Sequence, residues 1–316
     1  MAEGYRVVCL SPFDDYSQKL IDEVGCEWLE LPMDNMGSNP IKDVGLVIRF
    51  WRLYRKLRPV AAFHFTIKNN VYGTWAAWLA GVPAINNVSG LGTAFIRTGF
   101  LGAVVRTLYK LSMPLAFKVF CQNEEDYSLL IQRKLVPEDR LSLLPGSGVD
   151  LNRFNPSLLM RHESAFRFLY AGRMLADKGL YELIDAMRAI NADSIQCELW
   201  LCGFSDVKNV SAISQSELES WNKIPGVKYL GPSDSMETIY AQVDCVVLPS
   251  YREGMPRSLL EAGAMGLPAI ATDVAGCRNI VTHDLNGLLC CPRSTKSLML
   301  AMVKMIDMPN AVRTAM

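Results

Sequence analysis

Several features that mark other classes of protein are missing from this sequence. Lysine plus arginine and aspartate plus glutamate both number 32, so the formal net charge is zero and predicts no global attraction to nucleic acid. The nine cysteines form no C-x-x-C pattern, and they indicate neither a metal nor a disulfide framework. Such free cysteines fit a reducing cytosol. The most apolar long stretch, 99–121, is interrupted by basic residues and does not fit a membrane span.

Short apolar runs alternate with amphipathic helical patterns over most of the chain. One helical pattern covers 180–190, where apolar residues recur on a single face. Strand, helix and strand in repetition predict parallel sheets that are covered by helices on both sides. The strands are expected at 6–11, 61–65, 83–87, 118–121, 140–144, 166–171, 198–202, 227–230, 245–249, 268–272 and 287–290.

The length of 316 residues favours two domains. Near the middle, the segment LPGSGVDLNRFNP, at 144–156, is rich in Gly, Asn and Pro and is expected to be a linker. We therefore predict an N-terminal αβα domain over residues 1–155 and a C-terminal αβα domain over residues 156–316. Two such domains facing each other leave a cleft at the carboxyl ends of both sheets, where open α/β sheets bind ligands.

The strongest motif, YREGMPRSLLEA, starts at Tyr251 directly after a predicted strand. Pro256 suits the first turn of a helix, whose free N–H groups would form an anion site suited to a diphosphate. Glu253 precedes that helix and Glu261 lies within it, so the two carboxylates can reach different parts of one ligand. An isolated pair of glutamates is more often merely solvated, but the strand and glycine context here favours a sugar-binding site.

A second motif, GRMLADKG, runs from Gly172 to Gly179 between a predicted strand and a predicted helix. Arg173 and Lys178 bracket this loop at the carboxyl edge of the sheet. Two cations beside a helix N-terminus would neutralise a leaving diphosphate as its bond to a sugar breaks. The alternative is a solvated turn with a flexible glycine, which the presence of the Glu253 motif makes the weaker interpretation.

These motifs resemble those of the retaining glycosyltransferases of family 4, which have the GT-B fold of two facing Rossmann-like domains. The family pattern E-x7-E matches at Glu253 and Glu261, and the pattern G-R-x4-K-G matches at Arg173 and Lys178. The runs MGLPAIATDVAGCR and NGLL in the second half also match.

Two runs in the first half are similar to one subgroup of that family. HFTIKNNVYG, from His64, and VSGLGTAFI, from Val88, resemble the enzymes that build bacterial capsule, O-antigen and related lipid-linked glycans. The resemblance extends over nearly the whole chain. It departs at Ser89 and Gly90, close to the place where several relatives carry a histidine, and at Asn279, where many have glutamate.

The resemblance implies a role for each matching residue. Glu253, Arg173 and Lys178 would form the catalytic set, with the two cations on the donor diphosphate and Glu253 on hydroxyls of the transferred sugar. Glu261 would hold the ribose, and the turn at Leu230 would line the base. The family needs no metal for catalysis, and we expect no other cofactor. The remaining expected donor contacts are the backbone positions Gly254, Met255, Pro256 and Arg257.

The resemblance also implies an activity. A hexosyl or N-acetylhexosaminyl group would pass from a nucleotide sugar, UDP-linked, to a lipid-linked glycan acceptor with retention, in bacterial surface polysaccharide synthesis. The enzyme would be cytoplasmic, at the inner face of the membrane. Retaining hydrolases use a carboxylate nucleophile, but none can be named here. The acceptor would instead attack on the face from which the leaving group departs, while the protein supplies position and charge.

The start of the chain departs from the family. Relatives open with a strand, a glycine-containing loop and a helix before the segment equivalent to 4–11, and that unit is not recognisable here. We therefore expect an N-terminal domain that lacks its first strand-loop-helix unit. The alternative function is a non-catalytic or truncated remnant that still binds nucleotide sugar. A nicotinamide-dependent enzyme is rejected, because Gly146 and Gly148 are followed by neither a third glycine nor a helix.

Three further features remain open at the level of sequence. His64 could contact sugar or acceptor, although a structural histidine is somewhat favoured, and Gly90 is a further candidate contact. The segment 46–59 carries five basic residues among Phe50, Trp51 and Tyr54. It is either a membrane-surface helix for anionic lipids or an ordinary sheet-covering helix, which we favour for this helix taken alone.

Overall fold

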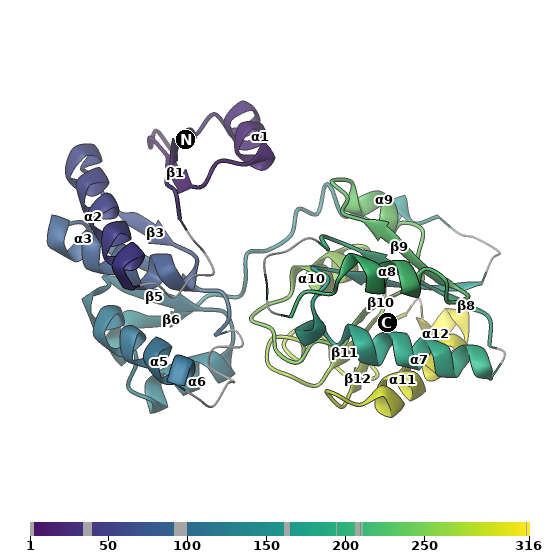
Figure 1. The fold of residues 1–316 in the computed structure, drawn as a ribbon. Coiled ribbons are helices and arrows are strands. Elements are labelled where there is room, and N and C mark those ends of the chain that lie inside the picture. The colour runs from purple at the N-terminus through teal and green to yellow at the C-terminus, as the bar shows by residue number, and fades with distance from the viewer. Residues whose placement is uncertain are drawn as a thin grey trace.

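The structure is a computed structural model that describes residues 3–33, 40–91, 100–160, 165–193, 195–205, 209, 211–313 and 315–316. The last five residues of the run VSGLGTAFI, 92–96, lie outside this description. The chain forms an N-terminal and a C-terminal αβα body, side by side in Figure 1. The connection between them runs from β6 to β7, and the predicted boundary at residue 155 falls within it.

The elements of the first half alternate between strands and helices. They are β1 (Val8–Ser11), α1 (Asp15–Val24), β2 (Glu27–Glu30), α2 (Pro40–Leu57), β3 (Ala62–His64), the π-helix Asn69–Gly73, α3 (Thr74–Ala80), β4 (Ala84–Val88), α5 (Phe100–Ser112), the 3-10 helix Met113–Leu115, β5 (Lys118–Cys121), α6 (Glu124–Gln132), the 3-10 helix Glu138–Arg140 and β6 (Leu141–Leu143).

The second half continues the alternation after the 3-10 helix Pro156–Leu158. Its elements are β7 (Phe166–Ala171), the 3-10 helix Ala176–Lys178, α7 (Leu180–Ala192), β8 (Cys197–Cys202), α8 (Gln215–Trp221), β9 (Val227–Gly231), α9 (Met236–Tyr240), β10 (Cys245–Leu248), α10 (Arg257–Ala264), β11 (Ala269–Thr272), β12 (Gly287–Cys290), α11 (Thr295–Asp307) and α12 (Asn310–Arg313).

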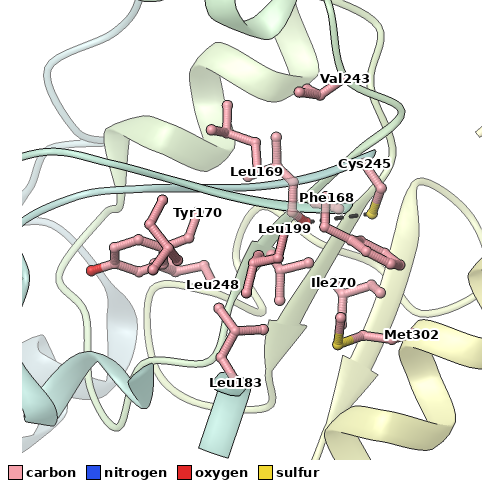
Figure 2. Packing of buried hydrophobic residues seen from close by; sticks show 14 of the residues in the cluster. Phe168, Leu169, Tyr170, Leu183, Leu199, Val243, Cys245, Leu248, Ile270 and Met302 are labelled. Atoms are coloured by element: carbon pink, nitrogen blue, oxygen red, sulfur yellow. Dashed lines mark hydrogen bonds between the residues drawn. The ribbon is translucent and has the colours of Figure 1, made fainter. Parts of the chain in front are cut away.

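The C-terminal sheet is parallel throughout, in the order β12-β11-β10-β7-β8-β9. The strand order therefore reverses between β7 and β10, and a crevice opens at the carboxyl ends of strands at such a point. Figure 2 shows side chains from these strands and from two helices meeting in one core, among them Phe168, Leu199, Ile270, Leu183 and Met302. This core fixes the strand ends that carry the predicted motifs.

The N-terminal strands form two separate parallel sheets. The larger has the order β3-β4-β5-β6, and the smaller pairs β1 with β2. In Figure 1 the unit of β1 and α1 lies apart from the larger sheet, on the side toward the C-terminal body. Tyr16 and Lys19 of α1 reach that body, where both contact Asp234, at 3.1 Å and 3.6 Å.

Candidate active site

A cavity of about 720 Å³ lies at the carboxyl ends of β7, β8, β9 and β10. Arg173, Lys178, Glu253 and Glu261 all line it. Two motifs that are separated by about 75 residues in the sequence therefore meet at one hollow, because their strands are neighbours in the sheet. The cavity sits at the reversal of strand order, the usual ligand position in this class of sheet.

Close packing fixes the loop that carries Arg173 and Lys178. The hydroxyl of the buried Tyr170 donates to the carbonyl oxygen of Arg173 at 2.8 Å. Gly179 has φ of +71°, and an added Cβ there would lie 2.1 Å from the carbonyl oxygen of Pro249. Only glycine fits this approach without displacing the loop. Lys178, directly before it, is thereby held beside the end of β10.

Lys178 and Glu253 form an ion pair across the cavity wall. The Lys178 Nζ lies 2.5 Å from Glu253 Oε1, and the two side chains are 20% and 12% exposed. The amine and the carboxylate thus each present part of their surface to the cavity. A phosphate oxygen could share the ammonium group, while sugar hydroxyls could donate to the carboxylate.

Glu261 lies within α10 and lines the same cavity, with its side chain 12% exposed. Tyr240 Oη donates to its carboxylate at 3.1 Å, and Arg257 Nη2 donates to it at 3.2 Å. Burial raises the pKa of Glu261, and the donated hydrogen bond from Tyr240 opposes that shift. Burial and the nearby Glu261 raise the pKa of Tyr240 well above its ordinary value, so this hydroxyl stays a donor.

The amino end of α10 points at the cavity, as the sequence predicts. The helix begins at Arg257, one residue after Pro256, and Met255, Pro256, Arg257 and Ser258 are among the lining residues. The partial positive charge of this helix end favours an anion there. Gly254 does not line the cavity. It is buried against the other domain, where an added Cβ would lie 1.8 Å from the carbonyl oxygen of Ser89.

Several lining residues escaped the sequence analysis. Arg153 belongs to the segment that was interpreted only as a linker, and its Nε donates to Glu237 at 2.7 Å. The sequence signal that could have identified this position is the basic Arg153 next to the aromatic Phe154, since both line the cavity. Phe204, Pro232 and Ser233 follow β8 and β9, so the turn expected to line the base does border the cavity.

Besides Gly254, three more predicted contacts lie outside the set of lining residues. Leu230 is exposed within β9, outside the set of lining residues. Gly90 is at the domain interface, where an added Cβ would lie 3.3 Å from the backbone nitrogen of Gly254. His64 is 3% exposed inside the N-terminal domain.

The bonds of His64 are those of a structural histidine. Its ring nitrogens lie 2.9 Å from Tyr54 Oη and 2.8 Å from Asn86 Oδ1. Desolvation by burial lowers its pKa to about 4, so the ring is neutral near pH 7. Of the two functions left open for His64, the geometry favours the structural one.

The described part of the chain contains no group of three or more His, Cys, Asp or Glu side chains arranged to hold a metal ion. Within the same residues, no helix has both the length and the apolar character required to span a bilayer.

Comparison with solved structures shows that the arrangement of the elements is that of the GT-B fold, as the sequence predicts. The chain superposes on Anabaena HepE in complex with UDP-glucose with a TM-score of 0.78 at 18% identity, covering 98% of this chain and 84% of that one. It superposes on WaaG, a glycosyltransferase involved in lipopolysaccharide biosynthesis, with a TM-score of 0.75 at 15% identity, covering 99% and 85%. At these identities the likeness concerns the fold alone.

Residues 165–308 match the family model described as Glycosyl transferases group 1, and this segment contains all four of the central cavity residues, Arg173, Lys178, Glu253 and Glu261. Two curated relatives extend the similarity into the first half of the chain.

The first of these relatives is the N,N'-diacetylbacillosaminyl-diphospho-undecaprenol alpha-1,3-N-acetylgalactosaminyltransferase of Campylobacter jejuni. It is 27% identical, and the match covers 93% of this chain and 80% of the relative. The second is the UDP-Gal:alpha-D-GlcNAc-diphosphoundecaprenol alpha-1,3-galactosyltransferase of Escherichia coli. It is 25% identical, over 84% of this chain and 71% of the relative.

Proposed function

We propose that this protein is a glycosyltransferase that moves a hexosyl or N-acetylhexosaminyl group from a UDP-sugar to a lipid-linked glycan, with retention, in bacterial surface polysaccharide synthesis. The observation that carries the proposal is the gathering of Arg173, Lys178, Glu253 and Glu261 around one cavity at the switch point of the sheet. The two relatives named above act on glycans joined to undecaprenol through a diphosphate, which supports the acceptor class.

Different residues of the cavity bind different parts of the donor. Arg173, Lys178 and the amino end of α10, all of which line the cavity, hold the diphosphate. Glu253 accepts hydrogen bonds from the transferred sugar. Glu261 accepts them from the ribose, at the end of the cavity where Arg153 also lies.

The chemical step needs no protein nucleophile in this scheme. The acceptor hydroxyl forms the new bond to the anomeric carbon as the bond to the diphosphate breaks, and the departing phosphate oxygen takes the hydroxyl proton. Lys178 and Arg173 stabilise the charge that develops on that oxygen. Attack from the face of the leaving group preserves the anomeric configuration.

The test is turnover of UDP-sugars by the purified protein with a polyprenyl-diphosphate-linked saccharide as acceptor. We expect a glycolipid product in which the new linkage has the configuration of the donor, as read by NMR. Lys178→Ala should bind UDP but turn over slowly at saturating donor, whereas Lys223→Ala, on the exposed surface, should match the wild type. UDP binding without turnover of any UDP-sugar would favour the non-catalytic alternative.

A further inference from the structure

The loop Ser250–Gly254, which carries Glu253, alternates its contacts between the two domains. Its odd-numbered residues are held by the C-terminal domain. The backbone nitrogen of Tyr251 donates to the carbonyl oxygen of Asp177 at 3.0 Å, and its hydroxyl donates to the carboxylate of Glu182 at 2.6 Å. Glu253 pairs with Lys178, as described above. One side of the loop is thus fixed by the domain that forms the cavity.

The N-terminal domain holds Arg252 and Gly254, the two residues that flank Glu253. Asn123 Nδ2 donates to the carbonyl oxygen of Gly254 at 2.9 Å, and the guanidinium of Arg252 forms an ion pair with Asp126. Asn123 is the N-cap residue of α6, and Asp126 lies in its first turn. Glu253 therefore lies between two residues that a different domain holds in place.

The side chains of Asn123 and Asp126 are buried and hydrogen-bonded to each other. Asn123 and Asp126 are both 0% exposed. Asn123 caps α6, because its Oδ1 accepts from the Asp126 nitrogen at 2.8 Å, and its Nδ2 also lies 3.2 Å from Asp126 Oδ2. A buried ion pair holds its two groups in a defined arrangement, and removal of one partner leaves an uncompensated charge. An exposed pair contributes little.

We propose that Asn123 and Asp126 are positioning residues for Glu253: the N-terminal domain sets the place of the sugar-contacting carboxylate through Gly254 and Arg252. The inference rests on the proposed role of Glu253. Its consequence is that the donor sugar is gripped correctly only while the two domains are docked at α6. Misplacement of a reacting group by about 1 Å can reduce a rate by about 100-fold, so such support matters for turnover.

Asn123→Ser is the variant that separates positioning from folding. Serine is an accepted N-cap residue, so the start of α6 is retained, but the donor to Gly254 is lost. We expect kcat to fall by about 10-fold. The Kd for UDP should stay at the wild-type value, because Glu261, Arg257 and Tyr240 do not touch Asn123. Amide hydrogen exchange over 250–256 should become faster.

Glu125→Gln is the matched control. Glu125 also lies in α6 and also bridges the domains, through Arg278, but its side chain is half exposed and does not contact the loop. This variant should keep the wild-type kcat and exchange rates. Wild-type turnover and wild-type exchange in Asn123→Ser would overturn the proposal. The exchange experiment needs no turnover, so it tests the positioning even if the proposed transfer reaction fails.

A double-mutant cycle tests Asp126 separately. Asp126→Asn and Arg252→Met each leave one buried charge or dipole without its partner, and each should lower the unfolding midpoint. The double variant should recover part of the lost stability while its kcat remains low, since the charges disappear together but the loop is still released. Strictly additive stability losses would show that Asp126 does not act through Arg252.

Discussion

The residue Glu261 offers the most direct test of the donor site. Glu261→Gln preserves the side-chain volume but replaces a charged acceptor by a neutral amide. Hydrogen bonds to charged groups contribute about 1.5 to 3 kcal/mol, so UDP affinity should fall by at least about 10-fold. Isothermal titration calorimetry measures it. Glu219→Gln, on the exposed side of α8, is the control, and an unaltered Kd in Glu261→Gln would refute the assigned contact.

The burial of Glu261 also predicts a pH dependence of binding. Its pKa is raised by desolvation, so the carboxylate takes up a proton at a higher pH than an ordinary glutamate does. The protonated group accepts hydrogen bonds less well, and UDP affinity should therefore fall as the pH drops through that raised pKa. Glu261→Gln lacks this component, so the ratio of the two Kd values should shrink toward acidic pH.

His64 predicts a pH dependence of stability instead. The native ring has a pKa of about 4, against 6.5 for an ordinary histidine, so the unfolded chain binds more protons between these values. The free energy of unfolding should consequently decrease by about 2 kcal/mol from pH 7 to pH 5. In urea titrations, His64→Gln should lose this part of the slope. His283→Gln, whose ring is half exposed, should keep it; equal slopes in all three proteins would exclude a buried neutral His64.

At the level of elements, the turn from the 3-10 helix Ala176–Lys178 into α7 depends on Gly179. Alanine in a left-handed conformation costs about 1 kcal/mol. Gly179→Ala adds a collision with the carbonyl of Pro249, whereas Gly81→Ala, at nearly the same φ of +70°, meets nothing within 4 Å. Gly179→Ala should therefore lower both the free energy of unfolding and kcat by more than Gly81→Ala does. Equal losses in urea unfolding would contradict the collision.

Most strands of the C-terminal domain were predictable because they have no exposed residue on either face. Such strands appear as continuous apolar runs, and those at 166–171 and 287–290 were predicted with their observed bounds. The start of helix α10 was predicted to within one residue from Pro256 and the strand before it. Strand β2 was missed, because Glu27 and Glu30 flank only two apolar residues and the strand is half exposed.

The surface of α2 was only partly predictable. A basic and aromatic helix was expected to offer Phe50, Trp51 and Tyr54 to a membrane interface if it bound one. Phe50 and Tyr54 are instead buried against the sheet, at 2% and 4% exposure, and this excludes them from any such contact. Only Trp51 is exposed. The period of the helix places the two buried rings on the opposite face, four residues apart.

For the whole molecule, the sequence predicted two αβα domains and a common site for Arg173, Lys178, Glu253 and Glu261, all of which line the C-terminal cavity, since both predictions follow from local patterns. It could not predict that Asn123 and Gly254, 131 residues apart, form a hydrogen bond. That contact depends on how two folded bodies dock, and no periodicity or motif encodes docking. Arg153 was missed for a related reason, because a linker residue acquires a function only when the linker packs along a cavity.

The outward face of α2 predicts that the whole molecule docks on a membrane surface. The outward face of α2 combines Val44, Ile48 and Trp51 with exposed basic residues, and its one acidic residue, Asp43, is buried and paired with Lys68. This arrangement fits an anionic lipid surface, where each basic residue contributes about 1 kcal/mol. A lipid-linked acceptor would make such contact useful.

Removal of two basic side chains from the outward face of α2 should weaken binding to anionic vesicles. Arg52→Ser combined with Arg55→Ser should weaken sedimentation with phosphatidylglycerol vesicles by about 30-fold, which corresponds to about 2 kcal/mol. Binding of the wild-type protein should fall as salt is added and should be absent with neutral phosphatidylcholine vesicles. Arg188→Ser, on the exposed face of α7, is the control because it lies in the other domain. If the double variant and the wild type sediment alike, α2 is only a covering helix of the N-terminal sheet.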